Sequence, residues 1–282
     1  MGNDVAAPRG TAVRTVLHVR TRCQTPRRVS SSGLLRLPSS STDGASSPVS
    51  LPVLWQDDCV VVVDKPAGWL VHNSAWAGPR EDTVVDVARR QIAAGLVPVH
   101  RLDRGTSGAL LLARSGADAS ALQAALGGAE ATKRYVALVR GPVRAVVDVD
   151  HALRDDEAPD APARPARSRL VPVRRSDVER CSLVAVELLS GRRHQARRHC
   201  KHASHPIIGD ASYGKGPLNR SYRERFGLAR LALHCARLAL PAAGVDVMAP
   251  LPADLRAPLA LLFPGIDVDA VVAAAVGADA GA

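Results

Sequence analysis

A single carboxylate lies between two arginines in residues 100–108, where Asp103 separates Arg101 from Arg104. Positive charge nearby favours the ionised form of a carboxyl group. An ionised carboxylate in a fixed orientation can act as a nucleophile. The small residues Gly-Thr-Ser-Gly follow, and then an apolar run, so we expect the carboxylate in a turn between two strands. We therefore select Asp103 as the candidate nucleophile.

Two other segments carry side chains that could meet Asp103 in one cleft. Tyr135 lies on a predicted strand, where a tyrosine taken alone is more often a core residue. Residues 191–199 combine four arginines, among them Arg197, with two histidines. A carboxylate, a phenol and a guanidinium group on separate elements are a combination that a catalytic site can use.

Three other chemistries fit these motifs less well. Residues 105–108 lack the lysine and the following helix of a phosphate-binding P-loop. Ser107 and His100 lie outside any Gly-x-Ser-x-Gly elbow of a hydrolase. Four histidines raise the question of a metal site: His194, His199, His202 and His205. Arginines crowd the same stretch and oppose a divalent cation, and the spacing of a zinc enzyme is missing, so we expect no metal.

The elements expected to position these residues are short and mixed in order. Strands are predicted near residues 53–55, 59–63, 69–72, 97–102, 109–113, 133–141, 170–173, 183–189 and 231–240. Helices are predicted near residues 83–94, 117–126, 193–203 and 253–262. Because regular βαβ spacing is missing, we predict an α+β fold with a mixed, largely antiparallel sheet.

Positive charge is concentrated in two parts of the chain, whose formal net charge is +10. Residues 1–50 carry seven Arg and two Asp, and residues 189–231 carry ten Lys or Arg against Asp210 and Glu224. A folded segment with this excess is typical of a protein that binds a polyanion, although a solvated basic face is the alternative. The apolar fraction of 46% can build a sizeable core, and no apolar run approaches the length of a membrane span.

We divide the chain into three parts. Residues 1–50 are rich in Ser, Arg, Thr and Pro without hydrophobic periodicity, which predicts a disordered extension. Residues 51–265 form the predicted catalytic domain, and residues 266–282 an Ala-rich tail. Arg- and Ser-rich N-termini can be organellar transit peptides, but we favour a dispensable extension on a cytoplasmic protein. Five widely spaced cysteines without a Cys-x-x-Cys pair agree with a reducing compartment.

Taken together, the motifs resemble those of the RluA-type pseudouridine synthases. The family pattern His-Arg-Leu-Asp-x-x-Thr-Ser-Gly is met in full at residues 100–108. Four further family motifs are met in order: Lys-Pro-x-Gly at 65–68, Lys-Arg-Tyr at 133–135, Gly-Arg-x-His-Gln-x-Arg-x-His at 191–199 and His-Pro-Ile-Ile-Gly-Asp at 205–210. The resemblance covers residues 51 to about 262 and implies the pseudouridine synthase fold, with helices flanking the sheet and a central catalytic cleft.

The resemblance also implies a reaction and roles for individual residues. The N-glycosidic bond of a uridine is broken, the uracil rotates, and it is rejoined to the ribose through carbon, without a cofactor. Asp103 would attack the ribose C1′ or the ring, and Arg197 would pair with it. Tyr135 would stack on the base and serve as general base, and Arg101 would help to displace the flipped nucleotide.

The substrate expected from the resemblance is RNA, with tRNA favoured. The expected RNA contacts are Arg101, Arg104, Arg192, Arg193, His194 and Arg198. Residues 192–199, 214–220 and 226–234 look most like the branch that modifies uridine 65 of tRNA, and we expect a monomer. The same chemistry on ribosomal RNA is the first alternative, and a non-catalytic RNA-binding protein is the second. Binding alone does not require a carboxylate among phosphate-binding arginines, which argues against the second alternative.

Overall fold

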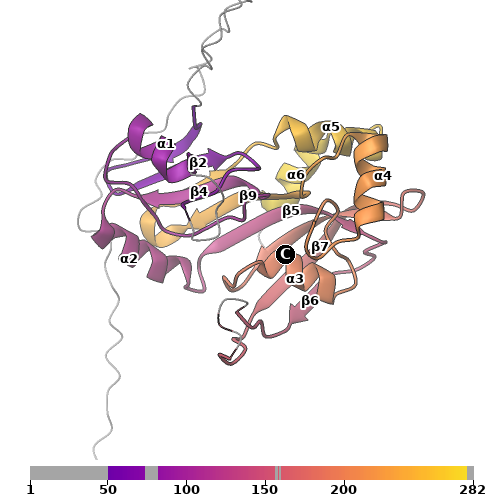
Figure 1. The fold of residues 1–282 in the computed structure, drawn as a ribbon, viewed down its shortest axis with the longest axis horizontal. Coiled ribbons are helices and arrows are strands. Elements are labelled where there is room, and N and C mark those ends of the chain that lie inside the picture. The colour runs from indigo at the N-terminus through magenta and orange to yellow at the C-terminus, as the bar shows by residue number, and fades with distance from the viewer. Residues whose placement is uncertain (1–49, 74–81, 156–157, 159, 278–282) are drawn as a thin grey trace, which may run out of the picture.

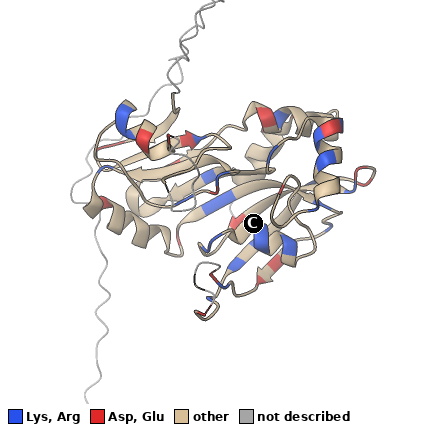
Figure 2. Cartoon of the chain, viewed as in Figure 1, with Lys and Arg blue, Asp and Glu red and all other residues tan. Residues whose placement is uncertain are grey.

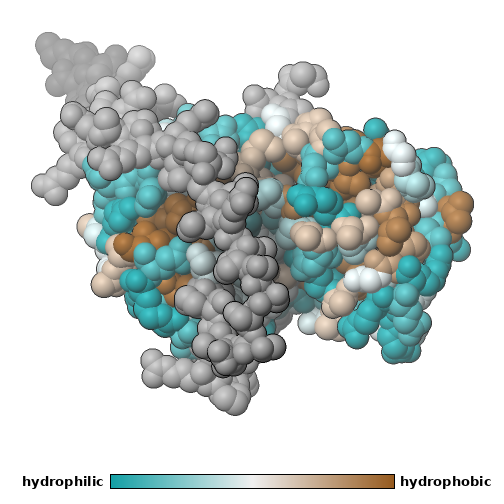
Figure 3. All heavy atoms as spheres, turned by 90° about the horizontal axis from the view of Figure 1, so that it is seen from above, coloured by the Kyte–Doolittle hydropathy of each residue, from teal (hydrophilic) through white to brown (hydrophobic). Residues whose placement is uncertain are grey.

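The computed structural model describes residues 50–73, 82–155, 158 and 160–277. The predicted disordered extension therefore lies outside the described residues, except for Ser50. Among the residues that are described, no helix has the length and apolar character needed to cross a lipid bilayer. On the face shown in Figure 3, small hydrophobic areas are separated by hydrophilic side chains where the residues are described.

A single mixed sheet runs through the described part of the chain, in the order β1-β2-β4-β9-β5-β8-β7-β6, with β10 paired to β9 and β3 to β4 (Figure 1). The strands are β1 (Val53–Gln56), β2 (Val60–Lys65), β3 (Val97–Pro98), β4 (Ser107–Ala113), β5 (Thr132–Arg140), β6 (Val147–Asp150), β7 (Arg167–Ser176), β8 (Cys181–Leu188), β9 (Leu233–Leu240) and β10 (Val245–Met248). Only β4 and β9 pair in parallel, which confirms the predicted mixed, largely antiparallel sheet.

Helices flank the sheet at both ends (Figure 1). They are α1 (Val84–Gln91), α2 (Gly116–Leu126), α3 (Gln195–His202), α4 (Gly216–Phe226), α5 (Ala253–Leu262) and α6 (Val268–Gly277). α1 and α2 lie at the end that holds β2 and β4, whereas α3 lies beside β7. Thr83 begins α1 with a reciprocal capping box to Asp86, as its residue type predicts.

The centre of the sheet is its most buried part and carries the loop of interest. All seven residues of β4 are buried, and the loop that precedes β4 contains Asp103. β4 approaches β9 closely at Gly108, which has φ +110°, and a Cβ there would lie 2.2 Å from the carbonyl oxygen of Cys235. Only glycine fits at this position, because a side chain would overlap the backbone of β9. Gly108 therefore allows the strand that follows the Asp103 loop to lie directly against β9.

The predicted tail is wrong for its described part. Val268, Val272 and Val276 recur at helical spacing and are buried in the core, and α6 packs against β5, β7, β8 and β9. Arg134 of β5 donates to the carbonyl oxygen of Val276 at 3.0 Å. The folded domain therefore extends to Gly277, beyond the predicted boundary at residue 265.

Two local predictions also differ from the structure. Residues 69–72 form no strand, because the carbonyl groups of Leu70 and Val71 accept hydrogen bonds from the first turn of α1 instead of a sheet partner. The predicted strand at 97–102 is reduced to β3. α4 was not predicted, although Leu218, Tyr222 and Phe226 recur at every fourth position and pack against the core.

Candidate active site

A cleft of about 510 Å³ opens between the Asp103 loop, β5 and the start of α3. Six of the predicted site residues line it: Arg101, Asp103, Tyr135, Arg192, Arg193 and His194. Their positions in the sequence are far apart, and the sheet order brings them together because β4, β9 and β5 are neighbours.

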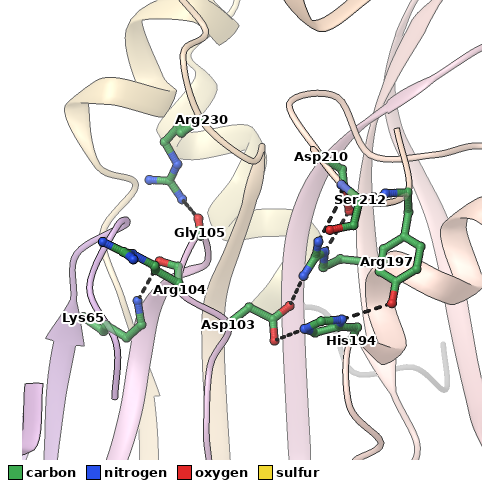
Figure 4. Close-up of polar contacts among 10 residues, drawn as sticks. Lys65, Asp103, Arg104, Gly105, His194, Arg197, Asp210, Ser212 and Arg230 are labelled. Atoms are coloured by element: carbon green, nitrogen blue, oxygen red, sulfur yellow. Dashed lines mark hydrogen bonds and ion pairs between the residues drawn. The ribbon is translucent and has the colours of Figure 1, made fainter. Parts of the chain in front are cut away.

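Arg197 lies behind the cleft and links two carboxylates (Figure 4). Its Nη1 donates to Asp103 Oδ2 at 3.1 Å, while Nε and Nη2 donate to the two oxygens of Asp210 at 2.8 and 2.9 Å. Burial lowers the pKa of Arg197, but the hydrogen bonds and the charge of Asp210 and Asp103 outweigh it, and the net pKa is raised. Arg197 is therefore a fixed cation whose third nitrogen, Nη1, donates to Asp103.

Asp210 contributes to the site through Arg197, although it was not predicted as a site residue. Burial raises its pKa, but hydrogen bonds from Arg197 and from the backbone of Ser212 and Tyr213 outweigh that effect, and the net pKa is lowered. Asp210 thus stays ionised at neutral pH although it is almost completely buried. Its place as the last residue of the motif at 205–210 was the available signal.

α3 is held in place by Gln195, its first residue. The Gln195 side chain accepts from the Arg192 backbone and donates to the Arg167 carbonyl of β7 at 2.8 Å. Two turns of the helix then place Arg197 and His199 on the buried side. His199 lies 2.9 Å from Ser168 Oγ and 3.0 Å from the His151 carbonyl, so it is a satisfied core histidine. Within the described residues, no group of three potential ligands is placed to hold a metal ion.

His194 faces Asp103 from the left-handed position that begins α3, with φ +53°. Its Nε2 lies 3.8 Å from Asp103 Oδ1, and its Nδ1 lies 3.1 Å from the Tyr213 hydroxyl (Figure 4). The Arg197 guanidinium also lies over the Tyr213 ring, 5.0 Å from its centroid. Tyr213 therefore supports both groups that contact Asp103, a role that no sequence motif indicated.

Tyr135 reaches the cleft from β5 and is 7% exposed. Burial, followed by the charges of Cys235 and Asp103, raises its pKa well above the usual value. The phenol therefore carries its proton at neutral pH. An apolar ring with a protonated hydroxyl is suited to stacking on a base and donating a hydrogen bond.

Arg104 and Arg198, two of the expected RNA contacts, do not line this cleft. Arg104 Nε donates to the Gly68 carbonyl at 2.9 Å, and its own carbonyl accepts from Lys65 Nζ at 3.3 Å. Arg198 Nη1 donates to the Arg154 carbonyl at 2.6 Å. Adjacent residues in a turn or helix point in different directions, so proximity to Asp103 or Arg197 in the sequence did not place them in the site.

Basic side chains form the rim of the cleft. We call Arg101, Lys133, Arg164, Arg192 and Arg193 the basic rim, because all five line the cleft. Lys133 and Arg164 were not predicted as site residues. Figure 2 shows Lys and Arg on α3 and at the start of β5, and both elements contribute residues to the lining of the cleft. An anionic backbone can therefore be held on the rim while one nucleotide enters the cleft.

Known proteins are similar to this chain in sequence and in fold. The family model described as RNA pseudouridylate synthase matches residues 59–202. A tRNA pseudouridine synthase C of Vibrio vulnificus is 38% identical over 206 residues, which cover 67% of this chain and 84% of that protein. A tRNA pseudouridine synthase C of Salmonella typhimurium is 40% identical over 208 residues, with 67% and 80% covered.

A solved structure agrees with these relatives. Human RNA Pseudouridylate Synthase Domain Containing 1 is 25% identical and superimposes with a TM-score of 0.62 over 82% of this chain and 97% of that chain. The chain therefore belongs to the RNA pseudouridylate synthase family, whose enzymes isomerise uridine in RNA to pseudouridine.

Proposed function

We propose that this enzyme isomerises a uridine of tRNA, at position 65, with Asp103 as the nucleophile. The observation that carries the nucleophile is the series of hydrogen bonds that links Asp210 to Arg197 and Arg197 to Asp103, which orients one carboxylate in the cleft. The tRNA substrate is supported by the relatives named tRNA pseudouridine synthase C. We further propose that the enzyme acts as a cytoplasmic monomer.

The cleft supports a sequence of steps in which each residue has one task. The basic rim holds the phosphates on either side of the target, and the nucleotide flips into the cleft at a cost of a few kcal/mol. Arg101 fills the place that the base leaves, and the Tyr135 ring stacks on the uracil. Asp103 then attacks at C1′ or at the ring, and the C1′–N1 bond breaks.

The uracil is then rotated and rejoined through C5. Formation of the C1′–C5 bond regenerates the carboxylate of Asp103; the proton on C5 is then lost to solvent, and N1, which the broken bond left without a substituent, takes up one proton. The basic rim can hold the phosphates throughout, so the RNA is not released between the two bond changes. The raised pKa of Tyr135 favours a stacking role over a role as a base at neutral pH.

The substrate is tested by mapping pseudouridines in the tRNA and ribosomal RNA of the host with and without its gene. We expect one tRNA pseudouridine, at position 65, to disappear, while the ribosomal sites remain. Purified enzyme should restore it in the unmodified tRNA. Loss of a ribosomal pseudouridine with intact tRNA would contradict the tRNA assignment and favour a ribosomal substrate.

A further inference from the structure

Arg230 lies beside the loop that carries Asp103, shortly before the chain enters β9. Its Nη2 donates to the Gly105 carbonyl at 3.3 Å, to Ser107 Oγ at 2.8 Å and to the Leu233 carbonyl at 3.0 Å (Figure 4 shows the contact with Gly105). One guanidinium group thus connects the loop after Asp103 to the first residue of β9. The Arg230 side chain is only 10% exposed.

The other edge of the same guanidinium reaches α5. Arg230 Nη1 donates to Asp254, in the first turn of that helix, at 3.1 and 3.3 Å. Because the guanidinium is planar and rigid, its two edges cannot move independently. Arg230 therefore fixes the Asp103 loop relative to both β9 and α5.

The loop itself leaves little room to move on this side. The Thr106 backbone donates to the Asp103 carbonyl at 3.0 Å, which closes the turn. A Cβ at Gly105 would lie 3.1 Å from Leu231 Cβ, so the turn rests directly on the residue that follows Arg230. Ser107 Oγ also lies 2.9 Å from His234 Nδ1. The Ser107 hydroxyl thus has two partners, Arg230 and a residue of β9.

A second basic residue holds the loop from another direction. Lys65 Nζ donates to the carbonyls of Pro66 and Arg104 at 2.9 and 3.3 Å. Burial lowers the pKa of Lys65 to about 7, with the charge of Arg230 acting in the same direction. Lys65 contacts the loop at Arg104, whereas Arg230 contacts it at Gly105 and Ser107 and also joins it to β9 and α5.

We propose that Arg230 is a positioning residue, which holds the 103–107 turn so that Asp103 reaches both Arg197 and the target nucleotide. The proposal rests on the proposed role of Asp103 as nucleophile. A displacement of about 1 Å in a reacting group can cost about 100-fold in rate, so loosening this turn affects catalysis before it affects RNA binding. Arg230 touches no reacting atom in this scheme and acts through the turn alone.

The test compares Arg230→Ala with Arg237→Ala. Arg237 is a matched control, because it also lies on the β9 segment, is paired with a half-exposed aspartate, Asp246, and donates to the carbonyls of Val276 and Gly277. It does not line the cleft. Both variants should lose stability, so turnover is measured well below both unfolding temperatures, by release of tritium from RNA labelled at uridine C5.

We expect Arg230→Ala to lower kcat by about 10- to 100-fold while KM and RNA affinity stay within about 2-fold, and Arg237→Ala to keep the wild-type kcat. Methylguanidinium added in solution should restore part of the kcat of Arg230→Ala. A kcat equal to that of Arg237→Ala, or a loss that methylguanidinium leaves unchanged, would overturn the positioning role.

A second readout needs no substrate and separates this proposal from the proposed function. Amide hydrogen exchange at Thr106, whose backbone donates to Asp103, should accelerate in Arg230→Ala and not in Arg237→Ala. Equal exchange in the two variants would overturn the proposal even if Asp103 is the nucleophile. Failure of the nucleophile assignment would instead appear as turnover by an Asp103 variant.

Discussion

Arg197 and Arg101 both lie near Asp103, but they differ in solvent exposure and in their hydrogen-bond partners. Arg197 is 9% exposed and makes three hydrogen bonds to two carboxylates. Arg101, on the basic rim, is exposed to solvent. A buried charge has to be paired to offset its desolvation, whereas an exposed one can stay solvated until a phosphate replaces the water. We infer that the buried arginine, Arg197, orients the nucleophile and that the exposed arginine, Arg101, binds the RNA.

The pairing of Arg197 is also asymmetric. Asp210 takes two of its donors in a buried bidentate pair, and Asp103 takes one at the edge of the cleft. Bidentate geometry fixes the direction of a guanidinium as well as its position. Asp210 therefore acts on Asp103 through Arg197, without touching the cleft itself.

The largest effect is expected from Arg197→Ala. It leaves Asp210 buried without its cation and Asp103 without its partner, so unfolding free energy should fall by about 3–5 kcal/mol. We expect kcat to fall by about 100-fold or more, because the carboxylate loses its orientation. Urea unfolding and tritium release measure the two effects. Wild-type kcat in the folded variant would contradict the role of the Asp103–Arg197 pair.

Asp210→Asn should have a smaller effect of the same kind. The amide keeps the size of the carboxylate but removes its charge, so Arg197 is held less firmly. We expect kcat to fall by about 10-fold with KM unchanged, since the substrate does not contact this residue. A rise in KM with unchanged kcat would show that Asp210 serves RNA binding and would remove the distinction between the buried Asp210–Arg197 pair and the basic rim.

Arg192→Gln tests the rim. We expect RNA affinity to fall, the slope of log affinity against log salt to decrease by about one, and kcat at saturating RNA to stay within about 2-fold. Arg198→Gln is the control, because Arg198 is tied to the Arg154 carbonyl outside the cleft. Equal losses of affinity in the two variants would show that RNA contacts extend around α3.

A half-buried histidine of the cleft wall, His100, is kept neutral and provides the smallest effect. Burial, with the charge of Lys133 next, lowers the pKa of His100 to about 4, and its Nε2 accepts a hydrogen bond from the Leu111 backbone. The folded state therefore binds fewer protons than the unfolded state between about pH 6.5 and pH 4. Stability contributed by His100 is present above pH 6.5 and is lost as the pH falls, by at most about 1.4 kcal/mol per pH unit.

His100→Gln removes this titration and isolates it from other groups. The difference in unfolding free energy between wild type and His100→Gln should change between pH 6.5 and pH 4 and be constant from pH 7 to pH 8. Urea titrations at each pH supply the difference. A difference that is flat across the acid range would mean that His100 is not held neutral.

Many residues of this site can be predicted from residue types and spacing, but the contacts between side chains depend on how the chain folds. The contact of Asp103 with Arg197 was expected, because both belong to motifs that the chain meets in full. Asp210 was not expected to bind Arg197, since nothing in its local sequence shows where the helix before it points. Arg104 and Arg198 stay predicted RNA contacts, but their side chains donate to backbone carbonyls outside the cleft, which their positions in the sequence do not reveal.

In the fold, too, some elements can be predicted from the sequence and others cannot. Strands with continuous apolar runs, such as β2 and β4, were predicted within a few residues, because burial on both faces leaves a clear sequence pattern. α6 was not predicted, since its small apolar residues are found in tails as well as in helices. What orders α6 is packing on β5 and β9, with Arg134 and Arg237 donating to its last carbonyls.

Asp103→Asn tests the central claim most directly. The amide matches the carboxylate in shape but is not a nucleophile, and Arg197 remains paired with Asp210. We expect tritium release to fall by at least about 1,000-fold, while the dissociation constant for tRNA stays within about 2-fold of the wild-type value. Measurable turnover by freshly purified Asp103→Asn, free of wild-type enzyme, would contradict a nucleophilic role for Asp103.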